Sequence, residues 1–362
     1  MELRPKKIDL YIFKKFILTF GTALLLIIGI VIVFDISEKI DDFVTNEAPL
    51  KAIILNYYLN FIPYFINMYS PMFVFITVIF FTSKMAANSE IIAILSGGVS
   101  YHRMMVPYMA AATLIALVSL GLNLYVIPDS NATRLRFESK YVKNKSTSVR
   151  NVHYQIDPGT FVYVESFSTW NNTAYKFTLE SIEGHSLKSK LTAETAAWDS
   201  TYQGWHLKKC FIREFSEGLG DQVRTMPELD TVINLTVSDF YRNKQTVQTL
   251  DSDNLNALIE TQKMRGDANV IYAQIEKHTR YTMPFSALIL TIMGVSLSAR
   301  KKRGGIGWNI AVGIALGFSY ILFLKFSQMF VFTGTMSPGM AMWLPNFLYA
   351  IVAAVLYRMA PK

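Results

Sequence analysis

The sequence has few of the groups that enzymes and metal-binding proteins most often use. Its 362 residues include a single cysteine, Cys210, which excludes an internal disulfide and a cysteine metal cluster. The five histidines are scattered, without the spacing of metal ligands. The P-loop, H-E-x-x-H, G-x-S-x-G and dinucleotide-binding glycine patterns do not occur. The sequence therefore predicts no metal, no cofactor and no enzymatic activity within this chain.

The middle of the chain, residues 129–280, also lacks any apolar run long enough to cross a bilayer. It holds 19 Lys and Arg against 19 Asp and Glu, so the net charge of +8 lies in the flanks. We therefore expect no nucleic-acid-binding domain. The chain is 51% hydrophobic, and the excess stands in blocks on either side of this neutral middle. The distribution predicts a membrane protein with an inserted soluble domain.

Six apolar runs flank the middle, three on each side. The first has 19 residues without a charge, a length that spans the roughly 30 Å hydrocarbon core. It is longer than the apolar region of a signal peptide. The second contains Pro63 and Pro71 and is too long for one straight crossing, so we expect tilt or kinks. We predict six membrane-spanning helices. The runs cover residues 16–34, 53–83, 104–128 and 281–299, and the last two share residues 304–357.

Basic residues gather in the segments that would face one side of the membrane. With both termini on that side, its segments hold 13 Lys and Arg against three acidic residues. The short loops of the opposite side hold two basic and five acidic residues. The positive-inside rule then predicts cytoplasmic termini and an exported middle, which would be periplasmic in the inner membrane of a bacterium with two membranes.

The exported middle changes from a helical to a period-two pattern at about residue 149. Short alternating stretches separated by turn residues continue to about residue 240 and predict an antiparallel sandwich or jelly roll. A helical pattern returns over residues 253–280 and leads into the fourth span. The predicted domains are residues 1–128 with helices 1–3, residues 129–280 with the β domain and its helical connection, and residues 281–362 with helices 4–6.

A cytoplasmic loop over residues 84–103 contains a short apolar helix pattern. The helix is expected to begin at Glu90 and to end near Gly97. It could pack under its own bundle or lie on the membrane. Alternatively, it could couple to a groove on a cytoplasmic partner, with Glu90 pairing a basic residue there. The residues proposed for that contact are Glu90, Ile91, Ile94, Leu95 and Gly97.

A few charges stand near or inside the apolar runs. Lys325 interrupts the fifth span, and a cation at membrane depth is a candidate functional residue unless it reaches the interface. Arg134 and Arg136 follow the third span at the depth of lipid phosphates, where they could also anchor to headgroups. The acidic stretch at residues 35–42 could be a solvated rim or an internal partner for such cations.

The order of three spans, an exported β domain and three spans resembles the lipopolysaccharide-export permease family, LptF/LptG. The similarity covers essentially the whole chain, and the N-terminal stretch leans toward the LptG-like members. The local stretches that carry it are Ile8-Asp-Leu-Tyr-Ile12, Ser89-Glu90 with Ser96-Gly97, Phe161-Val-Tyr-Val-Glu165, and Gly313 with Gly317-Phe318.

This resemblance implies a transport role. Such a permease pairs with a sister permease on a dimeric cytoplasmic ATPase. The complex extracts lipopolysaccharide from the membrane lipid and passes it through the β domains to a periplasmic β-jelly-roll bridge. The loop helix around Glu90 would engage the ATPase. In the first span only Lys39 matches the family's basic residues, so the expected lipid contacts are Lys39, Arg134, Arg136 and Lys325. An acyl-chain slot could be lined by Phe161, Tyr163, Phe177, Trp198 and Trp205, although such residues more often form a core.

Two other functions fit the same architecture. The chain could be a membrane-anchored receptor or scaffold whose exported β domain binds an envelope partner, although an apolar cytoplasmic loop favours a coupled permease. A lipid- or glycan-modifying enzyme would need catalytic groups near the membrane face, and none clusters there in the sequence.

Overall fold

The computed structural model describes residues 6–142, 148–184, 186–215, 220–240, 244–267, 269–299 and 305–360. The chain divides into two compact units. The membrane unit comprises residues 1–142, 248–252 and 274–362, and the sheet unit comprises residues 143–247 and 253–273. The basic run at residues 300–303, on which the predicted orientation partly rests, lies outside the described residues.

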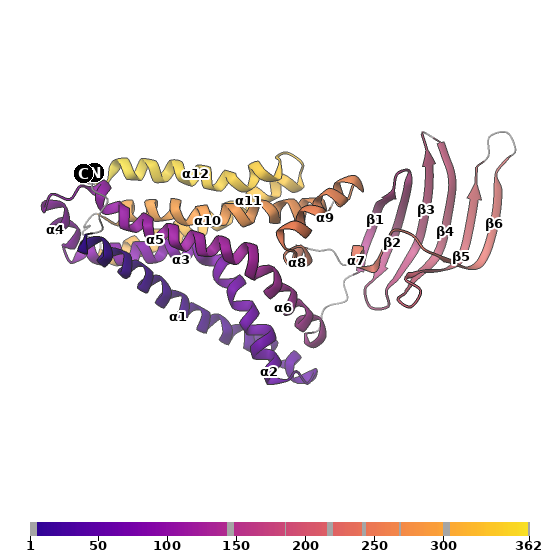
Figure 1. Ribbon diagram of the computed structural model, residues 1–362, viewed down its shortest axis with the longest axis horizontal. Coiled ribbons are helices and arrows are strands. Elements are labelled where there is room, and N and C mark those ends of the chain that lie inside the picture. The colour runs from indigo at the N-terminus through magenta and orange to yellow at the C-terminus, as the bar shows by residue number, and fades with distance from the viewer. Residues whose placement is uncertain are drawn as a thin grey trace. The chain divides into compact units, whose positions relative to one another are not determined.

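The prediction of six membrane-spanning helices is confirmed, since six helical stretches are long and apolar enough to cross a bilayer. The start of α1 and the end of α12 lie at the same end of the membrane unit as α4 (Figure 1). The helices of this unit are α1 (Lys7–Thr45), α2 (Leu50–Ala52), α3 (Leu59–Ala87), α4 (Glu90–Ser96), α5 (Tyr101–Gly121), α6 (Ile127–Tyr141), α10 (Val270–Ser298), α11 (Gly305–Phe332) and α12 (Pro338–Met359).

The second and third crossings contain irregular turns. A π-helical stretch, η1 (Ile53–Tyr58), joins α2 to α3, and another, η2 (Leu122–Val126), joins α5 to α6. Pro63 and Pro71 lie inside α3, where each removes one backbone donor. Because η2 joins α5 to α6 without a break, the third crossing continues as one helical stretch to residue 141, well beyond the apolar run that ends at residue 128.

Small residues let the membrane helices approach closely. A side chain added at Gly294 of α10 would meet Val78 Cγ1 of α3 at 3.0 Å. At Gly313 of α11 it would collide with Ile79 of α3. Because lipid tails are as apolar as the side chains, such close packing is what holds helices together in a bilayer. Helix α3 is accordingly the centre of the unit.

Buried polar side chains form bonds between these helices. Asn67 of α3 donates to Asn123 Oδ1 at 2.7 Å and accepts from the Ser119 hydroxyl at 2.6 Å. Asn346 of α12 accepts from the Tyr320 hydroxyl at 2.9 Å and donates to the carbonyl of Thr282 at 2.8 Å. Each pair satisfies groups that hydrocarbon would leave without a partner.

The inserted unit contains a six-stranded antiparallel sheet, which confirms the predicted β domain between the third and fourth spans. Each strand pairs with the next along the chain, from first to last. The described strands thus form one meander and not the two facing sheets of the expected sandwich or jelly roll. The strands are β1 (Ser148–Asp157), β2 (Thr160–Ser168), β3 (Thr173–Glu183), β4 (Ser186–Asp199), β5 (Gly204–Glu214) and β6 (Gln222–Thr231).

A kink runs across this sheet from β1 to β5. Asn151, Lys176 and Lys209 have positive φ angles of 53°, 50° and 53°, which are unusual for residues other than glycine. Glu165 and Glu194 lie beside them on the intervening strands and form ion pairs, Lys176–Glu165 at 2.6 Å and Lys209–Glu194 at 2.5 Å. The five residues form one row across the sheet.

The kink shifts the alternation of side chains. Inward-facing residues on either side of it are three positions apart instead of the usual two. The buried pairs that show this are Ala174 and Phe177 on β3, Ala193 and Ala196 on β4, and Leu207 and Cys210 on β5. Because of this three-residue spacing, the buried side chains on both sides of the kink belong to one continuous apolar face.

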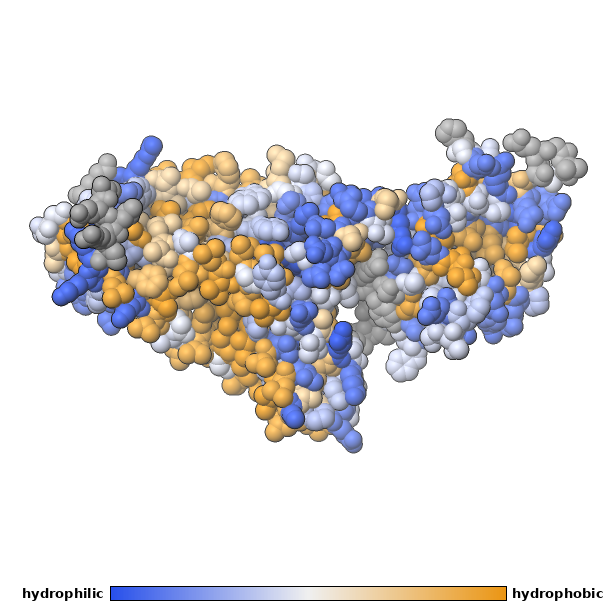
Figure 2. All heavy atoms as spheres, in the orientation of Figure 1, coloured by the Kyte–Doolittle hydropathy of each residue, from blue (hydrophilic) through white to orange (hydrophobic). Residues whose placement is uncertain are grey.

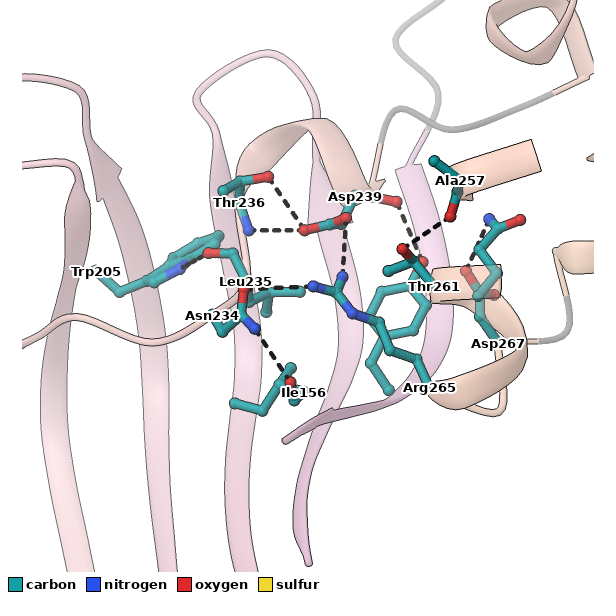
Figure 3. Close-up of polar contacts among 12 residues, drawn as sticks. Ile156, Trp205, Asn234, Leu235, Thr236, Asp239, Ala257, Thr261, Arg265 and Asp267 are labelled. Carbon is teal, nitrogen blue, oxygen red and sulfur yellow. Dashed lines mark hydrogen bonds and ion pairs between the residues drawn. The ribbon is translucent and has the colours of Figure 1, made fainter. Parts of the chain in front are cut away.

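The chain after β6 covers part of this apolar face (Figure 3). The Trp205 indole donates to the carbonyl of Leu235 at 2.8 Å, and Asn234 donates to the carbonyl of Ile156 at 3.3 Å. Phe240 stacks on Phe167 with ring centroids 4.1 Å apart. This covering segment, residues 233–240, includes the short helix α7 (Val237–Phe240). A single sheet thus gains a second layer without a second sheet.

Helix α9 (Ser252–Met264) and the turn after it complete the sheet unit. Arg265 forms an ion pair with Asp239 at 3.3 Å and a hydrogen bond with Asn234 Oδ1 at 3.3 Å, so it fixes the covering segment (Figure 3). Its own carbonyl accepts from the backbone N–H of Gln155 on the edge strand β1. A preceding short helix, α8 (Lys244–Val247), leads toward α9.

The kink makes a testable prediction. Lys176→Gly should raise local stability by about 0.5–1 kcal/mol, because relief of the left-handed conformation outweighs the extra flexibility of glycine and the loss of an exposed ion pair. The matched change Lys190→Gly removes a lysine that pairs with Glu180 at 2.8 Å without a positive φ. It should lower stability by about the same amount. Hydrogen exchange of β3 and β4 in the full-length protein measures both, and two equal losses would contradict the assignment.

Candidate functional site

The loop helix α4 divides its apolar side chains between two faces. Ile91 and Ile94 are 1% and 9% exposed and belong to the core formed with α1, α3 and α5. Leu95 packs partly against the same core. Ile92 is 50% exposed on the other face, and Gly97 at the end of the helix is exposed as well. The inward face therefore belongs to the chain's own bundle, and the outward face is the part open to a partner.

Glu90 is bonded within the chain. Its Oε2 accepts from the Tyr11 hydroxyl at 2.9 Å and lies 3.3 Å from Lys15 Nζ, and its Oε1 accepts from Asn88 at 3.3 Å. Burial alone would raise the pKa of Glu90, but the hydrogen bonds from Tyr11 and Asn88 and the nearby lysine lower it below its usual value. Glu90 is thus ionised at neutral pH and held toward α1.

Lys39 is enclosed in a polar cluster at the other end of α1. Its ammonium lies 3.1 Å from Asp35 and 3.7 Å from Glu138 of α6, and it donates to the Tyr57 hydroxyl. Asp35 also accepts from the hydroxyls of Tyr57 and Tyr58, both at 3.1 Å. One member of the acidic stretch at residues 35–42 is therefore an internal partner of Lys39.

Arg134 and Arg136 have different environments although they are two residues apart. Arg134 is 8% exposed, and its guanidinium lies 5.0 Å from the ring centre of Tyr64 and 3.8 Å from a Glu138 oxygen. Its Nε has no hydrogen-bond partner among the described residues. Arg136 is exposed on the same helix. Of the two, Arg136 is the one that a membrane lipid can reach directly.

Lys325 lies in α11 with an exposed side chain. Leu322 and Phe326, its neighbours on the same helix, are also exposed. A cation inside such an apolar surface has to be matched by an anionic group or reach the interface. Of the four predicted lipid contacts, the structure brings Lys39 and Arg134 to Glu138, and the side chains of Arg136 and Lys325 are exposed.

The five aromatic residues proposed for an acyl-chain slot do not share a face of the sheet. Phe177 and Trp205 are fully buried on the covered apolar face, and Trp198 packs partly against them. Phe161 and Tyr163 lie on the opposite face. There they line a groove of about 680 Å³ together with His153, Gln155, Glu180 and Lys190.

Part of the apolar face on β3, β4 and β5 is only half-buried. Leu179, Leu191 and Ile212 pair in register across β3, β4 and β5, and each is only half-buried. On the same face the row nearer the kink contains Phe177, which is fully buried. The row is therefore a partly exposed part of the otherwise buried apolar face.

A family model described as lipopolysaccharide export system permease LptF/LptG matches residues 10–359. The chain belongs to the LptF/LptG permease family. The match covers both sheet and membrane units and does not separate LptF-like from LptG-like members, so the leaning toward LptG is not decided. A comparison with curated proteins gives no match. As a permease subunit of a lipopolysaccharide transporter, this LptF/LptG chain is a multi-pass membrane protein and not itself an enzyme.

Sequence reasoning missed the partners of the charged residues in this LptF/LptG chain. Asp9 binds Arg103 through two contacts, one of them at 2.8 Å, although 94 residues separate them. Arg280 is 3% exposed, bonded to Glu276 at 3.2 Å and to the carbonyl of Leu250 at 2.7 Å. For Asp9 and Arg103 the only available signal was a charge next to an apolar run, which does not reveal a partner so distant in sequence.

The two arginines after the third span make a testable prediction. Arg134→Gln should lower the free energy of unfolding by about 1–3 kcal/mol, because it removes a buried cation and leaves Glu138 with one partner fewer. Arg136→Gln should change stability by less than about 0.5 kcal/mol, because that side chain is exposed. Unfolding of the full chain in mixed detergent micelles measures both changes. Equal effects would show that Arg134 is not enclosed.

Proposed function

We propose that this chain is the permease subunit of an exporter that extracts lipopolysaccharide from the inner membrane and passes it to a periplasmic β-jelly-roll bridge. A separate dimeric ATPase in the cytoplasm supplies the energy, and a sister permease completes the membrane pair. The single observation that supports this most is the two-faced helix α4. Its inner face is part of the membrane core, so force applied to its outer face is carried directly into the bundle.

The order of the spans supports opposite roles for the two ends of the permease. Helix α4 follows the second crossing and the sheet unit follows the third, so one crossing separates them along the chain. The positive-inside bias assigns the α4 side to the cytoplasm and the sheet to the periplasm. Energy then enters on one side, and the lipid leaves on the other.

The outward face of α4 fits a groove on an ATPase. Ile92, Ala93, Ser96 and Gly97 are exposed, and their side chains are small or apolar. A short helix that presents such a face is recognised by insertion into an apolar groove. In this proposal Ile92 is the anchor, while Ile91 and Ile94 transmit the force and Glu90 acts inside the chain.

The lipid contacts are assigned by exposure. Arg136 and Lys325 are accessible cations that can bind the phosphates of lipopolysaccharide. Lys39 and Arg134 are paired with Glu138 and act only indirectly, by fixing the local structure. Acyl chains exposed to water cost about 0.8 kcal/mol for each CH₂ group, so the receiving unit must offer an apolar surface. The half-buried row of Leu179, Leu191 and Ile212 is that surface in the sheet unit.

The anchor role of Ile92 is testable by co-purification with the ATPase. Ile92→Arg should weaken the association about 30-fold, as expected for loss of an interface anchor worth about 2 kcal/mol, without unfolding the chain. Val223→Arg is the matched control, because Val223 is 52% exposed on β6 of the sheet unit. The control should leave the association unchanged. Failure of the wild-type chain to retain any ATPase in gentle detergent would overturn the proposed function.

A further inference from the structure

Helix α1 is the membrane helix with the least support from the rest of its unit. Only 6% of its most apolar 18-residue window is buried, against 61% for the crossing that contains α3. Figure 1 shows α1 diverging from the other helices, and Figure 2 shows a broad hydrophobic surface in that region. Leu18, Leu25, Leu26, Ile30, Val33 and Phe34 are all more than half exposed.

The two ends of α1 are held, in contrast to its middle. At one end Ile12 and Phe16 are fully buried in the core shared with α3, α4 and α5. At the other end Phe43 is 3% exposed in an aromatic cluster with Tyr57. Asn46 there donates to the carbonyl of Tyr141 at 3.0 Å. The helix is therefore a rod fixed at its ends and free between them.

The polar contacts at the first end all reach the loop that carries α4. On one side of α4, Tyr11 and Lys15 bind Glu90 at 2.9 and 3.3 Å, and Lys15 also donates to Tyr11 at 2.6 Å. On the other side, Asp9 binds Arg103 at the start of α5. The charged side chains of these contacts are no more than 29% exposed, so water competes for them only partly.

We infer that Glu90 and Arg103 form an intrachain clamp that ties both ends of the α4 loop to α1, so that a displacement of α4 moves α1 directly. This inference rests on the proposed function for the source of the displacement. The clamp itself belongs to the isolated chain. Glu90 is then a positioning residue for α1.

The mechanics of α1 favour this transmission. A helix of 39 residues is about 58 Å long at 1.5 Å per residue and behaves as a stiff rod. A pull at the clamped end costs little packing in the middle, because almost none of the side chains there is fully buried. The cluster of Lys39 and Asp35 with Tyr57 and Tyr58 serves as the pivot at the far end.

The clamp can be tested in the full-length chain in lipid nanodiscs with no ATPase present. Spin labels at Leu25 of α1 and Leu117 of α5, in a Cys210→Ala background, report the position of α1 as a distance distribution. Both label positions are exposed, at 72% and 61%. Glu90→Gln and Lys15→Glu should each raise the displaced population about tenfold, because hydrogen bonds to charged groups are lost.

Reversal of the charges separates an intrachain clamp from other roles of Glu90. The double variant Lys15→Glu with Glu90→Lys restores the ion pair in the opposite sense, and it should bring the distribution back to that of the wild type. Glu260→Gln is the matched control, because Glu260 pairs with Lys263 at 3.2 Å on the surface of the sheet unit. It should shift nothing.

Two results would overturn the clamp. One is an unchanged distance distribution in both single variants, and the other is a displacement that the charge reversal leaves in place. Elution of each variant as a single folded species is checked beforehand, and Glu90→Gln is the mildest change at this position. Because the readout needs no ATPase, failure of the clamp is distinct from failure of the proposed function, which the co-purification experiment tests.

Discussion

A bilayer offers no water to polar groups, and most of this structure follows from that single constraint. The backbone must satisfy its own hydrogen bonds within hydrocarbon, so the apolar runs become helices. Several polar side chains that remain between the helices are paired, as Asn67 is with Ser119 and Asn123. Most charges lie toward the ends of the helices, where Asp9 meets Arg103 and Asp35 meets Lys39, and Lys325 of α11 is an exception. The same distribution leaves the middle of α1 without polar ties to its neighbours.

In the sheet unit the corresponding constraint is the burial of apolar side chains. A single sheet that is apolar on one face must cover that face or use it. Here the covering segment occupies one part of it with Leu235 and Phe240, held by Trp205 and Arg265 (Figure 3). Another part stays half-buried around Leu191. An acceptor for a lipid needs such a division, because a fully covered face would admit no acyl chain.

The membrane architecture was predictable because it depends on local composition. An apolar run of sufficient length has one stable outcome in a bilayer, and six runs gave six helices. The presence of an antiparallel sheet was predictable from alternating residues in the same way. Its single-sheet topology was not, because the sequence signals strands but not whether consecutive strands fold onto a second sheet.

The candidate site was predicted less well, since its contacts join residues far apart in the sequence. Tyr11 and Glu90 are 79 positions apart, and nothing local to either residue signals the bond. Phe161 and Phe177 lie on different strands, so alternation within a strand does not relate their faces. They lie on opposite faces because β2 and β3 pair with Val164, and not Phe161, opposite Phe177. Register and long-range pairing decide these positions, and both are properties of the folded chain.

In the proposed function, lipid moves from the membrane unit to the sheet unit when ATP is spent on the cytoplasmic side. Photo-crosslinking amino acids at Arg136 and at Leu191 measure this transfer in the chain reconstituted with its sister permease, its ATPase and lipopolysaccharide. We expect lipid adducts at position 136 without ATP and adducts at position 191 that appear only with ATP. Adducts at position 191 that do not depend on ATP, or their absence under all conditions, would contradict it.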